Sequence, residues 1–170
     1  MCDAGCDGSY AFGDLGNAIR RCREDVGVEI DLATGELTPK TAAGKSASAS
    51  QEDAKVTMPP EDGFSKWHWA IGKIKYNLVD PNAADGVLVY LKSSLTGEEP
   101  ADVLNYHREH ADFPHQTTAD QWFTESQFES YRRLGQHVVE QLFDKIEVKK
   151  RNPANIFGDL KEKWREQKKQ

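Results

Sequence analysis

The sequence has no long apolar run, few cysteines and no excess of positive charge. Its 170 residues include three cysteines, and 28 acidic residues outnumber 22 lysines and arginines, giving a formal net charge of −6. This acidic balance argues against nucleic acid as a main partner. Neither a membrane-spanning helix nor a basic-then-apolar secretion signal is recognisable. A small, odd number of cysteines favours a reduced, cytoplasmic protein.

Motifs for nucleophilic catalysis are also lacking. Gly44-Lys45-Ser46-Ala47-Ser48 is the nearest approach to Gly-x-Ser-x-Gly, but the last glycine is missing. Its Gly-Lys-Ser lacks the first glycine and the strand-helix context of a phosphate loop. Cys2 and Cys6 do not have the spacing of a redox or zinc pair. We therefore predict no catalytic residue, no cofactor and no metal ligand in this chain.

One group of histidines and acids is a candidate metal site. It consists of His107, His110, Asp112, His115 and Asp120. His107 and His110 are one helical turn apart and could share a face, as metal ligands do. However, Phe113-Pro114 interrupts the segment and no zinc spacing is matched. We interpret these residues as hydrogen-bonding groups that order a loop.

Three segments have the composition of strands. Residues 28–32 alternate apolar and acidic, residues 67–76 alternate with tryptophans on one face, and residues 87–91 are continuously apolar. The turn at 81–86 predicts that the last two form a hairpin. His68 would face away from Trp67 and Trp69, and a single strand histidine is usually structural.

Helices are expected where apolar residues recur every three or four positions. The expected helices span about 13–26, a segment starting at Pro100, about 125–143, and a basic terminal segment. Thr124 and Gln127 form a capping-box pattern. The expected buried stripes are Leu15, Ile19, Cys22 and Val26; Phe128, Tyr131, Leu134, Val138 and Leu142; and Ile156, Leu160 and Trp164. Gly135 interrupts the third helix and would allow close packing or a kink.

Two surface features have alternative interpretations. Asp120-Gln121-Trp122-Phe123 is either a binding loop or, as we prefer, an aromatic anchor that holds the loop against the sheet. The basic terminal helix either attaches peripherally to an anionic membrane or, as we prefer, docks on the domain.

These patterns predict a fold of the α/β class, which is α+β for this chain as it stands. A partial sheet with a β-hairpin is packed by helices. Four regions follow: 1–34 as turn, helix and short strand; 35–63 as a flexible, low-complexity insertion; 64–147 as hairpin plus helices; and 148–170 as the basic amphipathic helix.

Two long runs resemble a known family. LTGEEPADVLNYHREHADFPHQTTADQWFTESQFESYRRLG and DAGCDGSYAFGDLGNAIRRCREDVGVEIDL are similar to the C-terminal region of bacterial patatin-like phospholipases, which are serine lipid acyl hydrolases. The resemblance implies a Ser-Asp esterase site in Gly-x-Ser-x-Gly and Asp-Gly-Gly motifs upstream of this sequence. It implies a C-terminal fragment that completes the α/β sheet, has the upstream catalytic portion as its partner and is inactive alone. The alternatives are a stand-alone domain that binds a protein or membrane without catalysis, and a subunit that docks onto a separate catalytic half.

Overall fold

A computed structural model describes residues 10, 12–39, 63–117, 119–144 and 153–167. The described elements are α1 (Gly13–Val26), β1 (Glu29–Asp31), the 3-10 turn η1 (Gly35–Leu37), β2 (Trp69–Lys75), the 3-10 turn η3 (Tyr76–Leu78), β3 (Gly86–Leu91), α2 (Ala101–Glu109), α3 (Glu125–Asp144) and α4 (Pro153–Gln167). The chain is therefore a mixed α+β fold with a small sheet packed by helices, as predicted.

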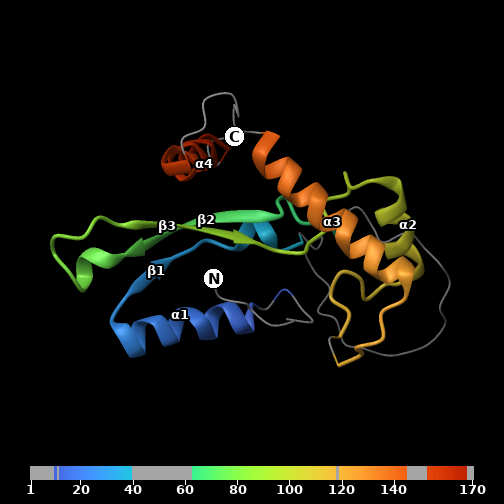
Figure 1. Cartoon of the computed structure of the whole chain (residues 1–170), viewed down its shortest axis with the longest axis horizontal. Coiled ribbons are helices and arrows are strands. Elements are labelled where there is room, and N and C mark those ends of the chain that lie inside the picture. Colours follow the sequence, from blue (N-terminus) through green and yellow to red (C-terminus); the bar gives the residue numbers. More distant parts are fainter. Residues whose placement is uncertain (1–9, 11, 40–62, 118, 145–152, 168–170) are drawn as a thin grey trace, which may run out of the picture.

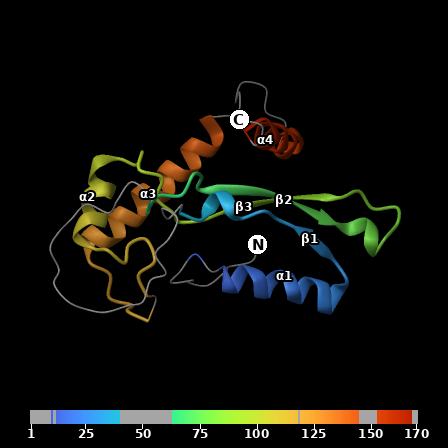
Figure 2. The same cartoon turned by 180° about the vertical axis from the view of Figure 1, so that it is seen from behind.

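The sheet is antiparallel, has three strands and follows the order β1-β2-β3. Ile30 lies opposite Ile74, and Trp69 lies opposite Leu91, so the predicted hairpin is confirmed. α4 contacts β2 and β3, whereas α1 contacts β1. The two helices lie on opposite sides of the sheet, and α2 and α3 gather at one end of it (Figures 1 and 2).

Gly72 permits the close approach of β1 and β2. A β-carbon at this position would lie 2.8 Å from the backbone oxygen of Asp31 and 3.0 Å from a methyl group of Leu32. Any side chain here would therefore push the segment after β1 away from the centre of the sheet.

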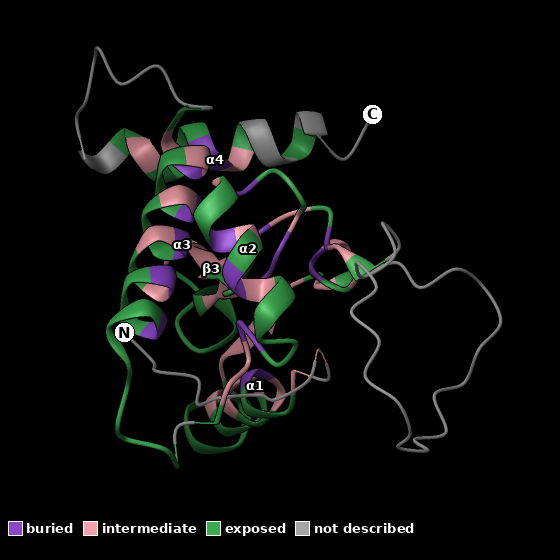
Figure 3. Cartoon of the chain, turned by 90° about the vertical axis from the view of Figure 1, so that its right-hand side faces the viewer, coloured by how far each residue is buried: buried purple, intermediate pink, exposed green. Residues whose placement is uncertain are grey.

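The apolar core consists of two clusters. The first surrounds β2 and contains Leu37, Trp69, Ala70, Ile71, Leu142 and Leu160. The second lies between the loop after β3, α2 and α3, and contains Leu95, Val103, Tyr106, Phe113, Leu134 and Val138. α3 contributes to both clusters, and its buried residues lie on the side that faces the rest of the molecule (Figure 3).

The predicted stripe of α3 is partly wrong. Phe128 is 64% exposed, whereas the helix buries Gln127, Ser130, Leu134, Val138 and Leu142. Gln127 is held at two points: its backbone N–H donates to the Thr124 hydroxyl at 3.1 Å, and its Nε2 donates to Gln116 Oε1 at 3.1 Å. The Thr124 cap is thus confirmed, while the side-chain arm of the capping box goes to Gln116 instead.

Other expectations also need correction. Val26 is exposed, because α1 ends at Gly27 in a left-handed conformation beyond the part of the helix that is covered. The insertion does not begin at residue 35, because η1 forms there and Leu37 is fully buried in the first cluster. Gly135 has open space around it and makes no close packing contact.

The start of the hairpin segment is held against η1. Ser65 Oγ donates to the Leu37 carbonyl at 2.7 Å, and the backbone N–H of Lys66 donates to the Glu36 carbonyl at 3.0 Å. The segments that flank residues 40–62 therefore lie side by side, at residues 36–37 and 65–66. Residues 40–62 themselves, including the Gly44–Ser48 motif, lie outside the described residues.

α4 docks on the sheet through the predicted apolar face. Leu160 is buried in the first cluster, and Ile156 packs against it. The side chain of Trp164 lies outside the described residues. None of the described helices combines the length and the apolar character needed to cross a bilayer.

Candidate functional site

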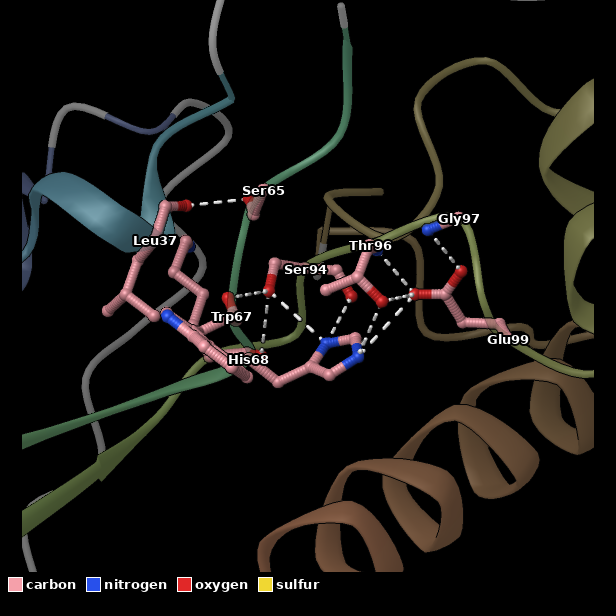
Figure 4. Close-up of polar contacts among 9 residues, drawn as sticks. Leu37, Ser65, Trp67, His68, Ser94, Thr96, Gly97 and Glu99 are labelled. Carbon is pink, nitrogen blue, oxygen red and sulfur yellow. Dashed lines mark hydrogen bonds and ion pairs between the residues drawn. The ribbon is translucent and has the colours of Figure 1, made fainter. Parts of the chain in front are cut away.

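Three segments that are distant in the sequence meet where the two apolar clusters join. His68 directly precedes β2, Glu99 lies two residues before α2, and His137 lies in the middle of α3 next to Val138 of the second cluster. The backbone N–H of Lys92 donates to the His68 carbonyl at 2.8 Å, which holds the start of β2 beside the loop that carries Glu99. Figure 4 shows His68 and Glu99 pointing toward each other across this loop.

The loop fixes the Glu99 carboxylate. Glu99 Oε1 accepts the backbone N–H of Thr96 at 2.5 Å, and Oε2 accepts the backbone N–H of Gly97 at 2.9 Å (Figure 4). Gly97 has φ of +90°, a conformation that favours glycine. The Glu99 side chain is fully buried, so the carboxylate orientation is set by these backbone donors and not by solvent.

His68 is buried and held in one tautomer. Its Nδ1 lies 3.0 Å from the carbonyl oxygen of Ser94. Because a carbonyl only accepts, Nδ1 carries the hydrogen, and Nε2 of the neutral ring presents its lone pair. This lone pair faces Thr96 Oγ1 at 3.2 Å and Glu99 Oε1 at 3.5 Å.

Burial lowers the pKa of His68 below its ordinary value. The Glu99 carboxylate opposes this shift, and the neighbouring His137 adds to it. When the ring is neutral, its Nε2 has no hydrogen to donate to Glu99, and the contact then brings two electron-rich atoms together.

His137 completes the group. The rings of His68 and His137 lie 5.6 Å apart, centroid to centroid, at an angle of 89°. Within the described part of the chain, His137 Nε2 is buried and has no hydrogen-bond partner. The ligand atoms of His68, Glu99 and His137 all lie within 4.8 Å of one another. We call these three residues the His-Glu-His group.

A serine borders this group, which raises the possibility of nucleophilic chemistry. Ser94 Oγ lies 3.4 Å from His68 Nδ1, so Ser94, His68 and Glu99 follow one another like a catalytic triad. However, Ser94 is 0% exposed, and its hydroxyl donates to the Trp67 carbonyl at 3.3 Å. The His68 nitrogen that faces Ser94 carries a hydrogen for the Ser94 carbonyl and cannot accept the hydroxyl proton. This arrangement is a buried polar network and not an accessible nucleophile.

The histidines considered from the sequence take separate places. His107 Nδ1 lies 2.8 Å from the Phe113 carbonyl, and the ring of His110 lies 4.2 Å from that of Tyr106. His115 contacts the ring of Tyr10 edge-on at 4.8 Å. The contacts of His107, His110 and His115 therefore agree with their interpretation as residues that order a loop. Among the described residues, the His-Glu-His group is the one set of three that could hold a metal ion. Cys2 and Cys6 lie outside the described residues.

The preferred interpretation of the 120–123 loop is wrong. Trp122 is 89% exposed and Phe123 is 52% exposed, so neither anchors the loop against the sheet. The loop is shaped instead by a local bond, in which the backbone N–H of Trp122 donates to Asp120 Oδ1 at 3.0 Å. Such a turn satisfies the backbone without requiring any aromatic contact.

Sequence reasoning missed two members of the His-Glu-His group. Neither Glu99 nor His137 was predicted as a site residue, and His68 was interpreted as structural. No motif spacing joins these residues, and the local signal available was a histidine between Trp67 and Trp69.

A comparison of this chain with family models, curated proteins and solved structures finds no match. The resemblance to patatin-like phospholipases therefore remains a prediction from the sequence.

Proposed function

We propose that this chain is the C-terminal, non-catalytic portion of a patatin-like lipid acyl hydrolase. In this proposal it completes the sheet and supports a Ser-Asp esterase site contributed by upstream residues. The proposal rests on the resemblance of residues 3–32 and 95–135 to that family.

The open edge of β3 is the observation that supports this function best. In the described part of the chain, β3 pairs with β2 alone. The strand is an apolar run, Gly-Val-Leu-Val-Tyr-Leu, whose first five residues are half-buried and whose Leu91 is exposed. An apolar edge strand is a surface to which another strand can add, and it tends to aggregate unless it is covered. A strand from the catalytic portion would cover this edge.

The burial of Ser94 supports a non-catalytic role. An acyl-transfer nucleophile must be reached by the ester, and Ser94 is enclosed within the polar network. We expect the purified chain to show no turnover of p-nitrophenyl butyrate above buffer and no labelling by a serine-directed fluorophosphonate. Turnover that the fluorophosphonate abolishes would contradict the proposal.

The genomic DNA upstream of codon 1 provides the decisive test of whether this chain is a C-terminal fragment. The proposal expects the reading frame to continue upstream of codon 1 and to encode Gly-x-Ser-x-Gly and Asp-Gly-Gly. An in-frame stop codon immediately upstream, with neither motif encoded beside it, would overturn the proposal.

Exposed aromatic residues favour a second candidate, a protein-interaction domain without catalysis. Trp122, Phe123 and Phe128 are all more than half exposed and occur close together in the sequence. Aromatic residues are enriched in protein interfaces. A patatin-like catalytic portion, expressed separately, is the candidate partner. Pull-down by the wild-type chain, weakened by Trp122→Ala but not by Tyr76→Ala, would favour this function; equal recovery with both variants would reject it for this loop.

A peripheral membrane role for α4 is the remaining part of the proposal. Docking of Leu160 and Ile156 directs the apolar face of α4 into the molecule, so binding to lipid would depend on the charge of the other face. Flotation with anionic liposomes but not with neutral ones would support this role. Equal recovery with both liposome types would end it.

A further inference from the structure

The His-Glu-His group brings together three potential ligand atoms, of which the buried Nε2 of His137 lacks a hydrogen-bond partner in the described structure. Buried polar atoms are normally paired, and an unpaired one calls for an explanation such as a bound ion. In addition, the lone pair of His68 faces a carboxylate oxygen at 3.5 Å with one hydroxyl, from Thr96, between them. The Thr96 hydroxyl has a single hydrogen and cannot donate to both atoms.

We propose that His68 Nε2, Glu99 and His137 Nε2 bind a divalent transition-metal ion of the zinc class. Two imidazoles and one carboxylate are a ligand set that zinc uses, with one position left for water. Magnesium and calcium prefer sets made wholly of oxygen ligands, so the two imidazoles select against them. The proposal depends only on these three residues and is independent of the patatin-like function.

The dimensions of the group suit this coordination. Ligands about 2.0–2.1 Å from a tetrahedral zinc ion lie about 3.3 Å from each other. His68 and Glu99 are already 3.5 Å apart. The widest separation in the group is at most 4.8 Å, so closure around the ion requires a ligand atom to move by at most about 1.5 Å.

The surroundings of the group resemble the outer shell of a metal site. A histidine ligand usually donates its other ring N–H to a carbonyl, and His68 Nδ1 does so to Ser94. A carboxylate ligand is usually held by hydrogen bonds, and Glu99 accepts two backbone N–H groups, from Thr96 and Gly97. Both ligands are therefore oriented before an ion arrives.

The site would connect the three segments that carry the two apolar clusters. Coordination would join the start of β2, the loop before α2 and the middle of α3 around one ion. The metal would then act as a cross-link within the fold, since His68 and Glu99 are closed to substrate by burial.

Cobalt(II) is the probe that reports this geometry. The full-length chain, without a histidine tag, carries Cys2→Ser and Cys6→Ser to remove the two closely spaced thiols, and it is freed of metal before titration. We expect one equivalent of cobalt to bind with tetrahedral visible bands and no thiolate charge-transfer band in the near ultraviolet. One equivalent of zinc should then displace it.

His137→Gln is the decisive variant, because it removes the imidazole and keeps a polar side chain at this half-buried helical position. It should weaken cobalt binding at least tenfold, while the matched control His110→Gln, outside the group, binds as the parent does. Circular dichroism confirms that both variants are folded. Less than a tenth of an equivalent bound to the folded parent, or unchanged binding by His137→Gln, would overturn the proposal and leave a bridging water as the occupant.

Discussion

At the scale of single residues, Glu99 is the most constrained side chain at the junction of the clusters. It accepts hydrogen bonds from two successive backbone N–H groups and from the Thr96 hydroxyl while fully buried. Its neighbour Glu98 is exposed. These two adjacent glutamates therefore have opposite environments. Replacing either one by glutamine removes a negative charge, but only the replacement of Glu99 also changes buried hydrogen bonds.

We expect Glu99→Gln to lower the free energy of unfolding by about 1.5–3 kcal/mol. The amide has one oxygen for two backbone donors, so one N–H of Thr96 or Gly97 would face an NH₂ group. Urea denaturation of both variants measures this, with Glu98→Gln within about 0.5 kcal/mol of wild type. Equal loss in the two variants would show that the backbone contacts do not stabilise the loop.

At the scale of elements, α3 is the helix that joins the two clusters. It buries Leu134, Val138 and Leu142 as the apolar pattern predicts, but Phe128 of that pattern is exposed. Leu134 is 1% exposed, whereas Phe128 is mostly in solvent. We expect Leu134→Ala to cost about 2–5 kcal/mol, because it removes buried methyl groups and leaves a cavity. Phe128→Ala should cost less than about 1 kcal/mol by urea denaturation. A larger loss of unfolding free energy for Phe128→Ala than for Leu134→Ala would show that Phe128, and not Leu134, faces the core.

Two glycines test the packing of elements in opposite directions. Gly72→Ala should destabilise the chain by about 1–3 kcal/mol, because the added methyl group meets the Asp31 carbonyl across the β1–β2 pair. Gly135→Ala should stabilise it by about 0.5–1 kcal/mol, since Gly135 lies in α3 with open space around it. Thermal melts of both variants provide the measurement. A stabilised Gly72→Ala would mean that β1 does not approach β2 this closely.

At the scale of the whole molecule, α3 places residues in both clusters, and the His-Glu-His group lies between them. The clusters should therefore unfold together. Tryptophan fluorescence includes Trp69 of the first cluster, while far-ultraviolet circular dichroism weights the helices of the second. We expect their denaturation curves to coincide, and two separated transitions would show that α3 does not couple the clusters.

Metal binding at the junction should stabilise the whole fold. A ligand at one hundred times its Kd adds about 2.7 kcal/mol to the free energy of unfolding. For a chain of this size, that corresponds to a rise in Tm of about 5–10 °C. Scanning calorimetry should show this rise with zinc, its reversal by EDTA and little effect of magnesium. An equal rise in His137→Gln would assign the effect to another site.

Local patterns were sufficient to predict most elements of the fold. The limits of α1, the hairpin of β2 and β3 and the Thr124 cap follow from apolar spacing, turn residues and capping chemistry, all of which act over a few residues. The patterns were insufficient for Phe128 and Trp122, because an apolar residue at the right spacing is buried only if a partner element reaches it. The bond between Gln127 and Gln116 is likewise a tertiary contact that local spacing does not reveal.

The amino-acid sequence by itself determined the class of fold and the pairing of the hairpin, since both depend on contacts between near neighbours. The tertiary structure alone decided that His68, Glu99 and His137 meet. These residues belong to a strand start, a loop and a helix without any shared spacing, and only the packing of α3 across two clusters brings their ligand atoms within 4.8 Å of one another.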